Sequence, residues 1–213
     1  MRLDHVSYAC APDGLDGTAG RIADRLGTQP LDGGVHPRFG TRNRIVSLTD
    51  HHYLEVVEAL DHPAVDRMPF GRAVRARTDT GGGWLGWVVA VDDLTPIEKR
   101  LRRARTPAHR VLPNEFELTW DQIGVSDLMH DPQLPFFVKW TSEDRHHPSH
   151  SADTGIGLKS LQIAGDPGRI IEWLGEPEDH PLDDVDVQWS APNGRPGLLS
   201  VTFTTSNGDV TVR

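Results

Sequence analysis

Leu3-Asp4-His5-Val6-Ser7-Tyr8 and Tyr53-Leu54-Glu55-Val56-Val57 are the two stretches of sequence that decide the fold. Both are typical of apolar strands, yet the first contains His5 and the second contains Glu55, two side chains that are costly to bury. Side chains alternate between the faces of a strand, so His5 and Glu55 point the same way if the two strands pair. The pattern therefore predicts half of a metal site or of an acid–base site.

A strand–helix–three-strand order surrounds these two stretches. The strand at 3–9 leads into a helix near 18–26, which Gly27 is expected to end as a left-handed C-cap. Three further segments have the alternation of strands, with a turn at 49–52 between the last two. They are 33–39, 41–48 and 53–59.

The same order is predicted to restart later in the chain. Thr95-Pro96-Ile97-Glu98 has the pattern of a helix start, and it follows an apolar segment at 86–91. We therefore predict an α+β fold in which tandem βαβββ modules form cupped mixed sheets that enclose a pocket, with a partial third module. The expected boundaries are 1–60 and 84–141 for the two modules, 61–83 for a connector with a short helix near 70–76, 142–156 for a polar linker, and 157–213 for a βαββ unit. Within the second module we expect strands at 116–120, 122–129 and 135–140, and within the last unit a strand at 158–164, a helix from Asp166-Pro167 to Gly175 and a hairpin at Asn207-Gly208.

The composition restricts the class of protein. The formal net charge is −9, which argues against a nucleic-acid partner because phosphate binding needs a basic field. The only cysteine is Cys10, so no internal disulfide can form and a cytoplasmic setting is expected. No apolar run has the length of a membrane helix, and Gly81-Gly82-Gly83 lacks the Lys-Ser/Thr of a phosphate loop, so neither a membrane partner nor a nucleotide cofactor is expected.

Four sequence segments together resemble the vicinal oxygen chelate superfamily, and within it the glyoxalase-like domain proteins. They are Leu3-Asp4-His5-Val6, the segment Gly33-Gly34-Val35-His36-Pro37-Arg38-Phe39-Gly40-Thr41-Arg42-Asn43, Tyr53-Leu54-Glu55-Val56, and Leu134-Pro135-Phe136-Phe137-Val138-Lys139-Trp140. The resemblance covers the first 140 residues by motif and the rest by the order of strands and helices.

The resemblance implies a divalent metal held by a histidine of a first strand and a glutamate of a fourth strand, here His5 and Glu55. Zinc, nickel, manganese or ferrous iron would suit these ligands and would polarise a substrate oxygen. His36 is a candidate third ligand or general base, and Glu55 is a candidate catalytic residue as well as a ligand. Two structural alternatives stay open. His5 and Glu55 could be a buried pair that only hydrogen-bond to each other, and His36 could simply end an edge strand.

The second module departs from the superfamily pattern. Alignment of the two first strands places Trp87 opposite His5, and alignment of the two fourth strands places Phe137 opposite Glu55. Neither side chain binds metal, so a complete four-ligand site is not expected. Both side chains, together with Trp140, are instead candidates for lining an apolar substrate pocket.

Polar substrate contacts are predicted on the strand after His36. Asn43 could bind a substrate carbonyl or only tie down the Gly40-Thr41 turn, and Arg42 is a further candidate for substrate binding. His146, His147 and His150 are predicted to lie on a surface linker without a metal role.

Two functions lead from the sequence, and a fold kept only for interaction with a partner is a third possibility. The first is a metal-dependent isomerase, lyase or dioxygenase that acts on a small oxygenated metabolite. The second is a non-catalytic protein that binds and sequesters a small molecule, like the antibiotic-resistance members of the superfamily. Members of the superfamily are often dimers, so the resemblance also leaves a homodimer open.

Overall fold

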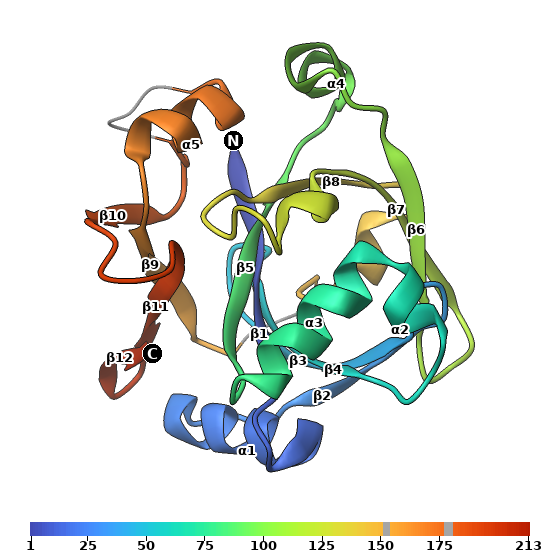
Figure 1. The fold of residues 1–213 in the computed structure, drawn as a ribbon. Helices are drawn as coiled ribbons and strands as arrows, with labels where there is room; N and C mark the ends of the chain where they lie inside the picture. Colours follow the sequence, from blue (N-terminus) through green and yellow to red (C-terminus); the bar gives the residue numbers. More distant parts are fainter. Residues whose placement is uncertain (151–153, 177–180) are drawn as a thin grey trace.

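Eight strands of the chain close into a barrel, and four later strands form a second sheet beside it (Figure 1). The structure is a computed structural model that describes residues 1–150, 154–176 and 181–213. Around the barrel the strands follow the order β1-β4-β3-β2-β6-β7-β8-β5. Their bounds are β1 Arg2–Ala9, β2 Leu31–His36, β3 Thr41–Ser47, β4 Tyr53–Ala59, β5 Gly83–Ala90, β6 Thr106–Val111, β7 Glu117–Ile123 and β8 Phe136–Trp140. The helices are α1 Gly14–Leu26, α2 Ala64–Arg67, α3 Pro69–Asp79, α4 Thr95–Leu101 and α5 Pro167–Leu174, with 3-10 turns at Val125–Asp127 and Asp144–His146.

The barrel consists of two halves with the predicted βαβββ order. β1 pairs in parallel with β4 in the first half, and β5 pairs in parallel with β8 in the second half. β1 and β5 then pair in antiparallel fashion, which joins the halves at the centre of the sheet. Gly27 ends α1 with φ 74°, as its position after the apolar stripe predicts.

The two edge strands β2 and β6 complete the barrel through a single residue pair, Val35 with Val111. Gly34 allows the backbones of β2 and β6 to approach each other this closely. Its φ is +94°, and a Cβ at this position would lie 2.0 Å from the carbonyl oxygen of Val111. Glycine is the residue that tolerates both conditions, so Gly34 allows the two halves to meet at this point.

The second half differs from the sequence-based expectation in two places. β6 was not predicted, because Thr106-Pro107-Ala108-His109-Arg110-Val111 contains a proline and polar residues that are not typical of a strand. The segment expected as two strands at 116–120 and 122–129 is one strand, β7, followed by a 3-10 turn.

The C-terminal unit has β9 Gly157–Ala164, β10 Asp186–Ser190, β11 Gly197–Thr205 and β12 Gly208–Val212. Its strand order is β10-β9-β11-β12, which differs from the barrel halves, and it has one strand more than the expected βαββ unit. The unit thus has the element order of the module but not its pairing, because its first strand β9 pairs in parallel with its second strand β10, whereas β1 pairs in parallel with the fourth strand β4. The hairpin at Asn207-Gly208 and the left-handed cap at Gly175 agree with the prediction. Residues 151–153 of the expected linker and residues 177–180 of the expected third module lie outside the described residues.

Two hydrophobic cores divide the side chains of the barrel strands. The outer core joins Leu3, Val6, Trp87 and Phe137 to residues of α1, α4, α5 and the C-terminal sheet. The inner core joins inward side chains of the barrel to Phe70, Ala73 and Val74 of α3. The C-terminal unit therefore covers the outside of the barrel. Among the helices of the described segments, none has the length and hydropathy needed to cross a membrane.

Candidate functional site

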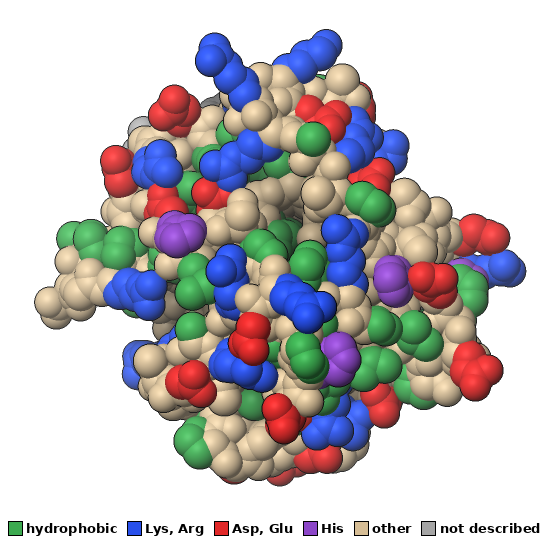
Figure 2. Space-filling view, turned by 45° about the vertical axis from the view of Figure 1, so that its right-hand side comes forward, with side chains coloured by type: hydrophobic (Ala, Val, Ile, Leu, Met, Phe, Trp, Pro, Cys, Tyr) green, Lys and Arg blue, Asp and Glu red, His purple; other side chains and the backbone are tan. Residues whose placement is uncertain are grey.

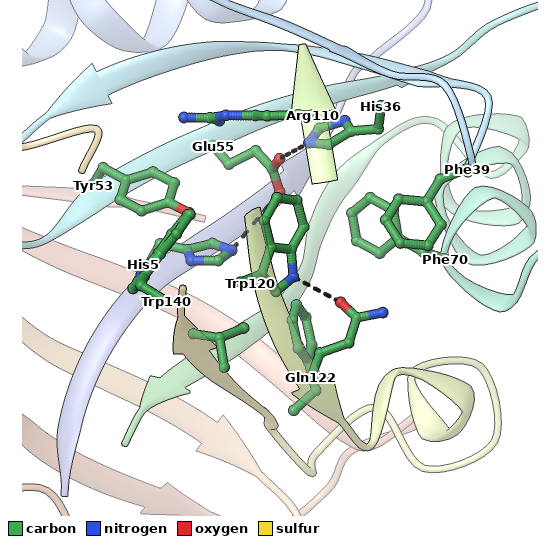
Figure 3. A pocket seen from close by; sticks show the side chains of 12 residues that line it. His5, His36, Phe39, Tyr53, Glu55, Phe70, Arg110, Trp120, Gln122 and Trp140 are labelled. Atoms are coloured by element: carbon green, nitrogen blue, oxygen red, sulfur yellow. Dashed lines mark hydrogen bonds and ion pairs between the residues drawn. The ribbon is translucent and has the colours of Figure 1, made fainter. Parts of the chain in front are cut away.

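A small cavity lies inside the barrel, where side chains from six of its strands meet (Figure 3). Its volume is about 30 Å³, enough for about two water molecules. Its polar residues are His5, His36, Glu55, Arg110 and Gln122, and its aromatic residues are Phe39, Tyr53, Phe70, Trp120, Phe136 and Trp140. Val138 completes the lining.

Glu55 of β4 lies between the two histidines of the cavity. Its Oε2 is 3.9 Å from Nε2 of His5, and its Oε1 is 3.8 Å from Nε2 of His36. Each oxygen also accepts a 2.7 Å hydrogen bond, one from Ser7 Oγ and one from Asn43 Nδ2. Burial alone would raise the pKa of Glu55, but the two imidazoles and these two hydrogen bonds outweigh burial and lower that pKa. The cavity therefore contains a buried, ionised carboxylate.

His5 is oriented by its neighbour Asp4. The register of β1 against β5 shifts between Leu3 and His5, and this β-bulge lets Asp4 approach the ring of His5. Nδ1 of His5 lies 2.7 Å from Oδ2 of Asp4. Because a carboxylate only accepts, Nδ1 carries the proton, and Nε2 of His5 faces Glu55. The ring of His5 also stacks on Tyr53 at a centroid distance of 4.4 Å.

Asp4 is fully buried and has two further partners besides His5. Its Oδ1 accepts hydrogen bonds from Trp140 Nε1 at 2.9 Å and from His147 Nε2 at 3.3 Å. Burial would raise the pKa of Asp4, but the hydrogen bonds of His147 and His5 hold that pKa well below its ordinary value. His147 is thus a buried partner of the site, whereas the sequence predicted an exposed linker residue.

His36 of β2 faces Glu55 from the opposite side to His5. Its Nδ1 lies 3.0 Å from Thr41 Oγ1, a contact that fixes the ring. Burial lowers the pKa of His36 to about 4; the positive charge of Arg110 acts in the same direction and Glu55 opposes it. His36 is therefore neutral at neutral pH, and a neutral imidazole can accept a proton at one nitrogen.

A larger groove adjoins the cavity and shares Phe39 and Gln122 with it. The groove has a volume of about 420 Å³, and the exposed Arg38 and Arg103 are among its lining residues. Figure 2 shows Lys and Arg side chains interspersed with Asp and Glu on this side of the molecule. A small substrate could place its reacting group in the cavity and its remainder in the groove.

The structure brings together five of the eight residues that the sequence singles out for the site. His5, His36, Glu55 and Trp140 line the cavity, and Asn43 supports Glu55. Arg42 is exposed, and its Nε donates to Glu58 at 2.7 Å on the outside of the barrel. Trp87 and Phe137 lie in the outer core, where Trp87 donates to the Gln133 carbonyl and Phe137 stacks on Trp173.

The register of the second half corrects the sequence alignment by one residue. His5 pairs with Tyr53 across β1 and β4, and Val88 pairs with Phe136 across β5 and β8. Val88 therefore corresponds to His5, and Val138 corresponds to Glu55. Neither valine can bind a metal, so the second half provides apolar walls in place of ligands.

The donor set of the cavity has the chemistry of a divalent-metal site, with two imidazoles and one carboxylate. The three side chains do not converge on one point, however, because His5 and His36 face different oxygens of Glu55. In residues 1–150, 154–176 and 181–213, no three His, Cys, Asp or Glu side chains are grouped so that they could hold one metal ion. The expected three-ligand set is therefore not assembled in this arrangement.

Sequence reasoning missed Asp4, Tyr53, Arg110 and His147, as well as most of the aromatic lining. Tyr53 could have been found, because it lies two residues before Glu55 and so shares its face of β4. Burial, followed by the charge of Asp4, raises the pKa of Tyr53 well above its ordinary value, so its hydroxyl stays protonated.

Comparisons with known proteins agree with this architecture. Residues 3–178 match a family described as "Glyoxalase-like domain". A crystal structure of a hypothetical protein from Staphylococcus aureus superposes with a TM-score of 0.73 at 14% identity, over 97% of this chain and 92% of that chain, which indicates a shared fold. A methylmalonyl-CoA epimerase from Streptomyces coelicolor gives a TM-score of 0.43 at 17% identity, over 67% of this chain and 97% of that chain. A hypothetical protein from Bacillus halodurans gives a TM-score of 0.42 at 11% identity, over 67% of this chain and 94% of that chain. The search of curated proteins found no match.

Proposed function

Because the chain belongs to the glyoxalase-like domain family, we propose that it is a small-molecule enzyme of the isomerase or lyase type. In this proposal, Glu55 and His36 move a proton on an oxygenated metabolite inside the barrel. The observation that carries the proposal is the buried, ionised Glu55 between two imidazoles that come from different strands. Titratable groups with displaced pKa values in a cavity are typical of catalytic sites.

The contacts of Glu55 suit a proton-transfer role. Ser7 and Asn43 each use one lone pair of the carboxylate, and the remaining lone pairs are free to approach a substrate C–H or O–H. A proton taken from a carbon beside a carbonyl leaves an oxyanion, which needs a nearby donor. The neutral ring of His36 lies on the same side of the cavity as Oε1 and can provide or receive the second proton.

A metal-dependent form of this chemistry is the second candidate, and the contact between Asp4 and His5 favours it. A carboxylate that accepts from the far nitrogen of a histidine is the usual outer partner of a metal ligand. His5 and Glu55 are the residues that would hold the ion. When bound, a divalent metal would polarise a substrate oxygen, and ferrous iron would extend the reactions to those of a dioxygenase. Metal content of the protein purified without chelators, compared with that of His5→Ala, tests this candidate.

Solvent-exchange NMR tests the leading proposal whatever product the reaction forms. The protein is incubated in D₂O with a panel of 2-oxo, 3-oxo and 2-hydroxy acids, and loss of the C–H signals is followed. Wild-type protein should accelerate exchange of at least one compound, and Glu55→Gln should slow that exchange by about 100-fold or more. Glu58→Gln is the matched control, since Glu58 lies on the same strand and pairs with Arg42 outside the cavity.

Two results would contradict the proposal. One is equal exchange by wild-type protein and Glu55→Gln. The other is saturable binding of panel compounds without any exchange, which would support the small-molecule binding function that the sequence also left open.

A further inference from the structure

Arg110 of β6 is the one buried arginine in the part of the chain that the structure describes, with 3% of its surface exposed. It lines the cavity, and its Nε has no hydrogen-bond partner. All other arginines of the described residues are more exposed, and several of them form ion pairs with carboxylates. Examples are Arg42 with Glu58, Arg44 with Asp32, Arg103 with Asp127 and Arg169 with Asp131.

No carboxylate of the described residues forms an ion pair with Arg110. Glu55, the acidic residue in the cavity, instead has ion-pair contacts with His5 and His36. A guanidinium stays protonated in proteins and so cannot escape burial by losing its charge. A buried cation without a partner is therefore costly, and a bound anionic ligand would supply the partner that this cation lacks.

The position of Arg110 relates it to the reacting groups. In Figure 3 its side chain runs from β6 alongside Glu55 toward Tyr53. Its charge acts on both groups: it adds to the effect of burial in lowering the pKa of His36, and it opposes part of the rise that burial causes in the pKa of Tyr53. An anion bound at Arg110 would thus hold its adjacent carbon beside Glu55, and the protonated hydroxyl of Tyr53 would be available as a second donor.

We propose that Arg110 binds the carboxylate of the substrate, so that the substrate class is a small monocarboxylic acid that reacts at a carbon near the carboxylate. This inference rests on the proposed function of the cavity. A planar carboxylate matches the two-pronged guanidinium in shape and charge. A phosphate dianion would be larger and would place more negative charge beside Glu55 and Asp4.

Calorimetric binding measurements test this assignment with matched pairs of probes. The acids are acetate, pyruvate, lactate and benzoate, and the controls are their neutral amides and inorganic phosphate. At least one acid should bind wild-type protein more tightly than its amide and than phosphate. Arg110→Met should weaken that binding by about 10- to 100-fold, Arg110→Lys by less, and the exposed Arg42→Met should leave it unchanged.

The thermal midpoint of Arg110→Met separates a ligand-binding role from a structural one. Because Arg110 has no ion pair to lose, this variant should unfold at the wild-type temperature or above it. A lower midpoint would assign Arg110 to stability and overturn the inference. Equal binding by Arg110→Met, absence of binding by every acid, or preferential binding of phosphate would also overturn it.

Glu55→Gln distinguishes this inference from the function on which it rests. If Glu55→Gln abolishes C–H exchange while Arg110→Met binds acids normally, the enzyme proposal stands and the role of Arg110 is wrong. If Arg110→Met loses binding while Glu55→Gln exchanges normally, the carboxylate site stands and the acid–base proposal is wrong.

Discussion

Nδ1 of His5 lies 2.7 Å from Oδ2 of Asp4, although neighbouring residues of a regular strand point to opposite faces. The contact exists because β1 has a bulge between Leu3 and His5. The same Asp4 side chain accepts hydrogen bonds from Trp140 and from His147, which lie far apart from it in the sequence. One irregularity in the first strand therefore connects the ring of His5 to the end of β8 and to the segment that follows it.

Asp4→Asn should destabilise the protein strongly. The amide would place an N–H among groups that already donate, and it would leave a buried donor without an acceptor. We expect a loss of about 3–5 kcal/mol in the free energy of unfolding, measured by urea denaturation at neutral pH. The exposed Asp24→Asn should lose almost nothing. A loss below about 1 kcal/mol for Asp4→Asn would show that Asp4 does not organise this cluster.

His147→Phe should retain the aromatic packing against Tyr53 and Trp140 but lose the hydrogen bond to Asp4. We expect a loss of about 1–3 kcal/mol in the free energy of unfolding, because the buried Asp4 carboxylate then accepts one hydrogen bond fewer. His150→Phe, an exposed position three residues later, is the matched control. Equal stability of the two variants would mean that His147 is the surface linker residue that the sequence suggested.

Gly34→Ala should weaken the closure of the barrel. The new Cβ would overlap the carbonyl oxygen of Val111, and φ at this position is +94°. We expect a loss of more than about 1 kcal/mol in thermal or urea unfolding. Gly20→Ala in α1 is the control, since a Cβ there meets nothing within 4 Å. That variant should gain about 0.5–1 kcal/mol, and a similar gain at Gly34 would contradict the described contact between β2 and β6.

The stability of the protein should fall on acidification partly through His36. Burial lowers the pKa of this histidine from 6.5 to about 4, so between these pH values the unfolded chain binds more protons than the folded chain. Stability therefore rises with pH across this window, and its loss between pH 6.5 and 4 should be about 3 kcal/mol from this group. Urea denaturation as a function of pH should show a flatter curve for His36→Asn than for wild type or for the exposed His130→Asn. Parallel curves would refute the lowered pKa.

The first half of the barrel could be predicted from the sequence, because local rules determine it. The alternation of Tyr53–Ala59, the apolar stripe of α1 and the cap at Gly27 each specify one element without reference to the rest of the chain. His5, His36 and Glu55 come together because β1, β2 and β4 have the expected order. The match to the glyoxalase-like family confirms the resemblance that the sequence segments around His5, His36 and Glu55 suggest.

The second half shows why the rest could not be predicted. Val88 and Val138 occupy the positions equivalent to His5 and Glu55, and Trp87 and Phe137 lie in the outer core, one residue away from what the sequence alignment predicts. A register shift of one residue exchanges the two faces of a strand, and no local sequence pattern indicates such a shift. Arg110 was missed because the sequence of β6 is not typical of a strand, and its pairing with β7 and β2 involves segments distant from it or without a local signal.

The ionisation of Glu55 tests the central claim most directly. Carbon-13 NMR of protein labelled at glutamate carboxyls can follow this group as pH is lowered from 7, with Glu55→Gln used to assign its signal. We predict that the carboxyl stays ionised below its ordinary pKa of 4.5, because His5, His36, Ser7 and Asn43 favour the charged form. A signal that titrates above pH 4.5 would contradict the account, since Glu55 would then be a buried neutral acid without the charge that the proposed proton transfer needs.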